Sequence, residues 1–198
     1  MRSIAIKQAL FLPLGTELIL MLVGFTVPGY SSISEHMSKL GLLGGYPAVF
    51  EQMLSVIEGV SLIIFSLALV RHPSGRFAFT VLTSVLFGIS MVCNGVFPMG
   101  SPLHGLYGIG FFTVLTPALF VAEIHPSERP PTFFVASKWA AVIALFYFWL
   151  MITGFDPMGF RGLTQRLAVI TMIGWYSYAS YTLLCSGKVT RVEKSTPA

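Results

Sequence analysis

Carboxylic acids interrupt two long apolar stretches of the sequence. Glu17 lies in the middle of the first stretch, and Glu51 and Glu58 lie in the second. Glu51 and Glu58 are seven residues apart with Ser55 between them, so a helix would place all three on one face. An ionisable group in hydrocarbon costs at least about 2.5 kcal/mol, and it usually faces a bundle interior or a polar cavity. This stripe predicts a proton path or an anchor for a cationic or hydroxylated ligand; a structural glutamate that hydrogen-bonds to a neighbouring helix is an equally good interpretation.

Histidine and arginine stand near the ends of the apolar stretches. His104 opens the fourth stretch, where a neutral imidazole is a weak candidate for a catalytic base. Arg166 lies about one turn inside the last stretch, where a guanidinium needs a carboxylate or a lipid phosphate as partner. A structural clamp between Arg166 and a carboxylate is the simpler of these interpretations. The carboxylates available for it are Glu35, Glu51 and Asp156.

These polar residues together predict an outward-facing polar cavity that binds a lipid or another small amphiphile. The candidate ligand-binding residues are Glu17, His36, Glu51, Glu58, Asn94, His104, Asp156 and Arg166. Asn94 also fits a structural role, because amide side chains within a bundle often hydrogen-bond between helices.

The chain that carries these residues is very apolar. Of its 198 residues, 55% are hydrophobic and only 10% are charged, and the mean hydropathy is +0.79. A typical soluble domain carries about 25% charged residues. This composition excludes a soluble enzyme, a disordered chain, a coiled coil and a disulfide-framework secreted protein, and it indicates a polytopic membrane protein.

Six stretches have about the 20 apolar residues that a helix needs to cross the hydrocarbon core. We expect transmembrane helices at 8–28, 48–70, 77–97, 104–123, 137–155 and 164–186. The predicted fold class is therefore all-α, a six-transmembrane-helix bundle that forms one domain over 1–187. A short basic cytoplasmic tail would follow at 188–198. Pro13 and Pro117 predict kinks in the first and fourth helices.

The distribution of Lys and Arg predicts the orientation of the bundle. With both termini in the cytoplasm, nine of the 12 Lys and Arg residues lie in inner segments, and the outer loops hold only Lys39, Arg161 and Arg166. We therefore expect a multi-pass protein of the cell membrane with cytoplasmic N- and C-termini. Orientation also explains the net charge of +4, so nucleic acid is not an expected partner.

Sequence signatures of metal, nucleotide or nucleophile chemistry are missing. The four histidines occur singly, without an HxxxH or HExxH pattern, and GxSxG, Walker A and dinucleotide fingerprints are absent. We therefore expect no metal site and no cofactor, and whether the chain is an enzyme stays open.

The loop motifs resemble those of one family of membrane proteins. They are YSSIS (30–34) with SKLG (38–41), GVFP (95–98) with His104, and GLTQR (162–166). In these motifs the chain is similar to the six-helix prokaryotic integral membrane proteins catalogued as "domain of unknown function 998", over about residues 10–187. The resemblance implies the fold and a motif cluster at one membrane face, and it brings no known reaction. The chain departs from the family at Met99 and Gln165, where acidic residues are common.

Three functions remain open at this point. The first is a protein that binds or moves a membrane lipid or small amphiphilic ligand. The second is an intramembrane lipid-modifying enzyme, in which His104 acts as base and Arg166 holds a phosphate. The third is a structural or assembly subunit that docks a membrane-protein partner or forms a homo-oligomer, with Ser84 and Gly88 as a candidate small-residue packing face.

Overall fold

The described part of the chain is mostly helical, with loops between the helices. The structure, a computed structural model, describes residues 2–193. Its α-helices are α1 (Arg2–Ala9), α2 (Leu12–Thr26), α3 (Gly45–Leu69), α4 (Ala78–Val96), α5 (Thr116–Glu123), α6 (Pro131–Thr153) and α7 (Arg161–Glu193). Its 3-10 helices are η1 (Met37–Leu42), η2 (Leu106–Leu115) and η3 (Pro126–Glu128).

Six helical segments are long and apolar enough to cross a membrane, as the sequence predicts. They are Ser3–Thr26, Gly45–Leu69, Ala78–Val96, Leu106–Glu123, Pro131–Thr153 and Arg161–Cys185. The first segment begins earlier than residue 8 and the fifth earlier than residue 137, because helices continue past the apolar stretch into polar flanks. The last helix runs to Glu193 and not to 186, so the first part of the expected tail is helical. Residues 194–198 of that tail lie outside the described residues.

Proline divides two of the six segments. Pro13 lacks a backbone N–H, and its ring would clash with the carbonyl of Ala9, the last residue of α1, so α2 begins as a separate helix. Pro117 stands in the first turn of α5, and the residues before it form η2 instead of a regular α-helix. The fourth segment therefore differs from the continuous helix expected over 104–123.

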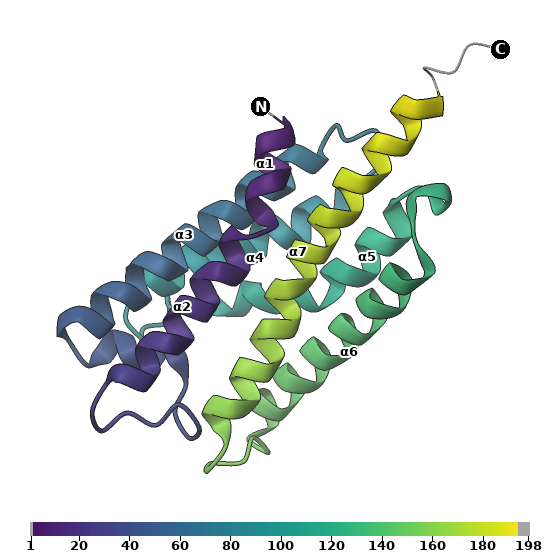
Figure 1. Cartoon of the computed structure of the whole chain (residues 1–198). Coiled ribbons are helices and arrows are strands. Elements are labelled where there is room, and N and C mark those ends of the chain that lie inside the picture. Colours follow the sequence, from purple (N-terminus) through teal and green to yellow (C-terminus); the bar gives the residue numbers. More distant parts are fainter. Residues whose placement is uncertain (1, 194–198) are drawn as a thin grey trace.

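The six segments form a closed ring. α2 packs on α3, α3 on α4, α4 on η2 and α5, these on α6, α6 on α7, and α7 back on α2. Figure 1 shows α7 running between α2 and α6, with α1 and the last described turns of α7 at the same end of the bundle. The segments 27–44, 97–105 and 154–160 lie at the opposite end, which we call the loop-rich end. Under the predicted orientation it faces outward.

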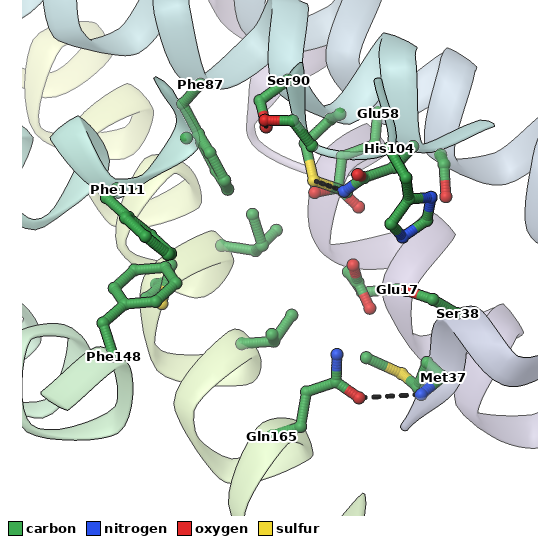
Figure 2. A pocket seen from close by; sticks show the side chains of 18 of the residues that line it. Glu17, Met37, Ser38, Glu58, Phe87, Ser90, His104, Phe111, Phe148 and Gln165 are labelled. Atoms are coloured by element: carbon green, nitrogen blue, oxygen red, sulfur yellow. Dashed lines mark hydrogen bonds between the residues drawn. The ribbon is translucent and has the colours of Figure 1, made fainter. Parts of the chain in front are cut away.

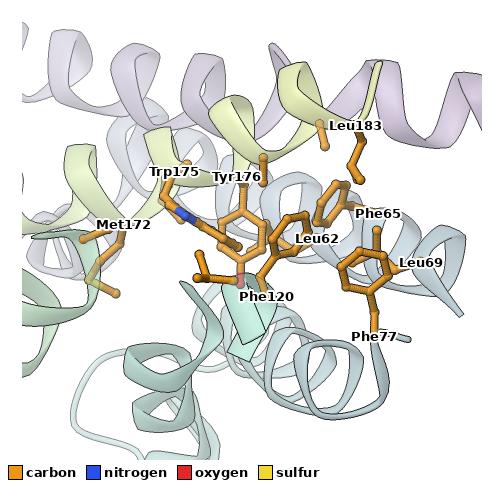
Figure 3. Packing of buried hydrophobic residues seen from close by; sticks show 14 of the residues in the cluster. Leu62, Phe65, Leu69, Phe77, Phe120, Met172, Trp175, Tyr176 and Leu183 are labelled. Atoms are coloured by element: carbon orange, nitrogen blue, oxygen red, sulfur yellow. The ribbon is translucent and has the colours of Figure 1, made fainter. Parts of the chain in front are cut away.

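A dense aromatic core fills the half of the ring that lies away from the loop-rich end (Figure 3). Phe65 meets Tyr176 edge to face at 5.8 Å between ring centroids, and Phe120 meets Trp175 in the same way at 5.4 Å. Trp175 Nε1 donates a 2.9 Å hydrogen bond to Ser137 Oγ. Side chains fill this half, and the cavity described below lies between it and the loop-rich end.

The N-terminal end of α4 is capped by a residue that comes from another helix. No side chain of its own sequence caps α4, and Glu123 of α5 instead accepts from Phe79 N at 2.8 Å and Thr80 N at 2.9 Å. A backbone clip holds this arrangement, in which Arg76 N donates to Glu123 O at 3.0 Å and His125 N donates to Ser74 O at 2.7 Å. A carboxylate at a helix N-terminus binds free N–H groups and the positive end of the helix dipole.

We predict that Glu123→Ala lowers the free energy of unfolding by about 1 kcal/mol, the usual cost of losing an N-terminal cap. Glu123→Gln keeps one acceptor oxygen, so we expect it to retain part of this stability. Thermal unfolding in detergent, followed by circular dichroism, measures both variants. Equal melting temperatures for the wild type and the alanine variant would contradict the capping role.

Candidate functional site

A cavity of about 360 Å³ lies inside the ring between the loop-rich end and the aromatic core. All six spans contribute to its wall, since lining residues come from α2, α3, α4, η2, α6 and α7, together with η1. Figure 2 shows its two sides, with rings of Phe87, Phe111 and Phe148 on one and polar groups on the other. The polar lining residues are Glu17, Ser38, Glu51, Ser55, Glu58, Ser90, Asn94, His104, Tyr147 and Gln165.

Glutamate carboxyl groups from α2 and α3 meet in the polar wall. The carboxyls of Glu17 and Glu58 are in hydrogen-bonding contact, and Thr16 Oγ1 donates to Glu58 Oε2 at 3.4 Å. Glu51 hydrogen-bonds to Ser55 one helical turn farther on. Two ionised carboxylates have only acceptors, so the contact between Glu17 and Glu58 requires one proton. The side chains are almost fully buried, with exposed fractions of 4% for Glu17, 3% for Glu51 and 1% for Glu58.

Several oxygens of the polar wall have no hydrogen-bond partner. They are Glu17 Oε2, Glu58 Oε1 and Asn94 Oδ1, each buried from solvent. The amide nitrogen of Asn94 donates a hydrogen bond to Met91 Sδ at 3.5 Å. Most buried polar atoms in native proteins are paired, so a group of unpaired acceptors around one cavity needs an explanation.

His104 presents one ring nitrogen to the polar wall. Its Nδ1 lies 2.9 Å from the carbonyl oxygen of Phe97, which can only accept, so in the neutral ring Nδ1 carries the proton and Nε2 the lone pair. The chain then makes a left-handed turn, with φ of 71° at Gly105, 46° at Leu106 and 53° at Tyr107. Such a conformation is costly for residues with a Cβ. The turn brings Gly105 O to Ser90 Oγ, a 3.0 Å hydrogen bond that joins η2 to α4.

The apolar wall is aromatic and sulfur-rich. Phe111 of η2 and Phe148 of α6 meet edge to face, with centroids 4.7 Å apart. Met151 and Met172 extend this wall along α6 and α7. The left-handed turn and the 3-10 geometry of η2 are the local features that place Phe111 in the cavity wall. Hydropathy alone predicts neither feature.

Arg166 does not line the cavity but fastens the loop above it. Its Nη1 donates to the carbonyls of Ser32, Glu35 and Gly162 at 2.6, 3.1 and 2.9 Å, and its Nη2 donates to Tyr30 Oη at 2.7 Å. The side chain is 6% exposed. The sequence predicted a clamp between Arg166 and a carboxylate, and this prediction is wrong: within residues 2–193 the hydrogen bonds of Arg166 go to backbone carbonyls and a phenol. The reason is that the loop turns its carbonyls inward.

The loop and the start of α7 fit closely together. Leu163 N donates to Ile33 O at 2.9 Å, and Met37 N donates to Gln165 Oε1 at 2.7 Å. A Cβ on Gly162 would lie 2.3 Å from Glu35 O, so only glycine allows this approach. The motifs at 30–34 and 162–166, far apart in the sequence, are thus two halves of one contact.

Comparison with known proteins agrees with this architecture. The family model described as "Protein of unknown function (DUF998)" matches residues 14–181, which is most of the chain. The chain belongs to the DUF998 family. No curated protein and no solved structure matches the chain in the corresponding searches. The resemblance seen in the loop motifs is therefore confirmed, and those motifs hold the DUF998 chain's loop-rich end together.

Two further candidate residues pair outside the cavity. His36 Nε2 lies 4.0 Å from Asp156 Oδ2, while Asp156 Oδ1 accepts from Thr164 Oγ1 at 2.8 Å. Nearby, Lys39 forms an ion pair with Glu35. Hydrogen bonds from Lys39 and from the Ser31 backbone lower the pKa of Glu35 below its ordinary value. These pairs lie in the loops and link them to one another.

The structure thus divides the sequence candidates into two groups. Five of them line the cavity, namely Glu17, Glu51, Glu58, Asn94 and His104. The other three, His36, Asp156 and Arg166, hold the loops above it. Within the described part of the chain, no group of three or more His, Cys, Asp and Glu side chains is placed to hold a metal ion.

Sequence reasoning missed several lining residues. Gln165 uses its Oε1 on Met37 N, which leaves its amide nitrogen directed into the cavity (Figure 2). Ser38 and Tyr147 also line the wall. The helical spacing of Gln165, Val169, Met172 and Ile173 marks one face of α7, and this spacing was the available signal.

Proposed function

We propose that this DUF998 protein binds a small amphiphile in the cavity, from the outer face of a prokaryotic cell membrane. The observation that carries the proposal is the division of the wall into a carboxyl-rich side and an aromatic side. A molecule with one polar end and one apolar end matches both sides in a single orientation. The volume of about 360 Å³ lies at the lower end of the range of about 300–1,000 Å³ for ligand pockets.

The position of Arg166 favours binding over lipid-modifying chemistry. An enzyme that acts on a phosphate head group needs a cation at the reacting group. Nη1 of Arg166 donates to the carbonyls of Ser32 and Glu35, and Arg166 is not among the lining residues. His104 would therefore act without the anion-binding partner that the enzyme hypothesis gave it.

The small-residue face of α4 favours binding over a purely structural role. Ser84 Oγ accepts from Ser66 Oγ of α3 at 2.6 Å, and a Cβ on Gly88 would lie 2.8 Å from Gly59 O of α3. This face is used inside the chain. It therefore gives no support to the hypothesis of an assembly subunit that docks a partner there.

We predict that filling the cavity removes the ligand. Val169 lines the cavity on α7, and Val169→Phe adds an aromatic ring to the open space. Leu167, two residues away and 59% exposed, offers the matched control Leu167→Phe on the outer face of the same helix. Native mass spectrometry after extraction in mild detergent should show a bound small molecule in the wild type and in Leu167→Phe, and a loss of at least tenfold in Val169→Phe.

Two results would count against the proposal. One is a bare polypeptide in the wild type under conditions that preserve the fold. The other is equal occupancy in Val169→Phe and the wild type, which would place the retained molecule elsewhere on the protein.

A further inference from the structure

We propose that the polar end of the ligand is a primary ammonium group, so that the cavity takes an alkylamine or arylalkylamine. This inference rests on the proposed function and specifies its ligand class. Three features carry it: the signs of the charges around the cavity, the surplus of unpaired acceptors, and the aromatic wall opposite them.

The ionisable groups around the cavity favour a cation. The carboxyls of Glu17, Glu51 and Glu58 line it, and the described lining includes neither Lys nor Arg. The charge of Arg166 acts on Glu17 from outside the wall, and its Nη1 donates to loop carbonyls. An anionic head group would meet acidic side chains without a partner of opposite charge, at short range and low dielectric. A phosphate or carboxylate head group is therefore disfavoured.

The hydrogen-bonding groups favour an ammonium over a hydroxyl. Apart from the one proton that Glu17 and Glu58 share, three buried oxygens accept no hydrogen bond from the described residues: Oε2 of Glu17, Oε1 of Glu58 and Oδ1 of Asn94. An ammonium group has three donors and no acceptor, whereas a hydroxyl has one donor and two acceptor lone pairs. Glu58 is 1% exposed and Glu17 is 4% exposed, so a donor that pairs with them must lie inside the bundle. A primary amine can satisfy such a set of acceptors with charge-assisted bonds, which are the strong ones.

The opposite wall is suited to the tail of such a molecule. Phe111 and Phe148 form an edge-to-face pair, and Figure 2 shows both rings across the open space from Glu17 and Glu58. Phe87 lies on the same apolar side. Aromatic rings bury apolar tails and also attract a cation that approaches their faces. The ammonium would then sit at the carboxyl pair, with its aryl or alkyl tail against these rings.

A matched pair of probes tests the inference on the purified full-length protein in detergent. Phenylbutylamine and phenylbutanol share one tail and differ in the amine or hydroxyl group at its end. Isothermal titration of each probe, with Val169→Phe measured in parallel to subtract partition into micelles, gives the specific binding. We expect the amine to bind the wild type at least tenfold more tightly than the alcohol.

The variant Glu58→Gln keeps the size of the side chain and removes its charge. We expect it to weaken amine binding at least tenfold and to leave alcohol binding within twofold of the wild type. Thermal unfolding checks that this variant folds, and the comparison of the two probes on the wild type does not depend on it.

The remaining outcomes separate the two proposals. If both probes bind the wild type equally and Val169→Phe abolishes both, the ammonium inference is overturned and the amphiphile site stands. If neither probe binds the wild type above the Val169→Phe background, both proposals are overturned.

Discussion

Replacing Gly59 by alanine is expected to destabilise the bundle by about 3 kcal/mol, at the upper end of the usual cost of overpacking. A Cβ at Gly59 would lie 2.4 Å from Gly88 O and 2.7 Å from Val92 N. Both are backbone atoms of α4, which no side-chain rotation can move away. α3 and α4 would have to separate, and this separation would outweigh the gain of about 1 kcal/mol that alanine brings to a helix.

A second glycine in a transmembrane helix provides the control for this prediction. Gly174 of α7 has no atom within 4 Å of its would-be Cβ, so Gly174→Ala should be neutral or stabilising by up to about 1 kcal/mol. Thermal unfolding of both variants in the same detergent makes the comparison. If Gly59→Ala melts at or above the temperature of Gly174→Ala, the close approach of α3 and α4 is wrong.

This contact also explains why the cavity lies where it does. Glycine lets helix backbones approach closely in membranes, where lipid gives no hydrophobic drive for association. Gly95, farther along α4, approaches Gln52 O of α3 in the same way, with a would-be Cβ at 2.4 Å. The α3–α4 pair is thus closed along its length. The open space lies inside the ring, between this pair and the other helices, and the 3-10 helix η2 forms part of its wall.

Hydropathy predicted most of the fold. The six spans follow from apolar length, and the breaks at Pro13 and Pro117 follow from the missing N–H of proline. The left-handed turn at 105–108 could not be predicted, because it includes Leu106 and Tyr107, residue types that rarely adopt positive φ. That turn depends on tertiary contacts, including the hydrogen bond between Ser90 and Gly105.

The sequence identified part of the cavity wall because ionisable side chains are costly to place in hydrocarbon. Glu17 and Glu58 stand out because a carboxyl in hydrocarbon needs a reason, and the structure brings the two into contact. Phe111, Phe148 and Gln165 gave no such signal. Aromatic residues are ordinary in a membrane helix, and whether they face lipid or an interior depends on how the helices are rotated against their neighbours.

Polarity was a poor guide to Arg166, whose role depends on backbone that has no sequence signature. A buried guanidinium is expected to find a carboxylate, yet here it donates to backbone carbonyls of a tight loop. Tyr30 extends this network, because its Oη accepts from Arg166 and lies 3.2 Å from Glu35 O and 3.1 Å from His36 O. The loop and the guanidinium therefore depend on each other.

Arg166→Met is accordingly expected to lower the free energy of unfolding by about 3 kcal/mol or more, since each buried acceptor left without a donor costs about 1–3 kcal/mol. Arg166→Lys keeps the charge but not the planar fork, so we expect it to recover less than half of the loss. Arg161→Met removes a half-buried arginine from the first turn of the same helix and serves as the control. Thermal unfolding ranks the three variants.

The same substitution should also act on the cavity, because the clamped loop continues into η1, where Met37 and Ser38 line the wall. Hydrogen exchange of the backbone amides of 30–41 should rise in Arg166→Met by at least tenfold relative to Arg161→Met. Ligand retention should fall in parallel even though Arg166 touches no part of the cavity. Unchanged exchange at 30–41 together with lost retention would instead mean that Arg166 contacts the ligand directly, and it would reverse the division between loop-holding and ligand-binding residues.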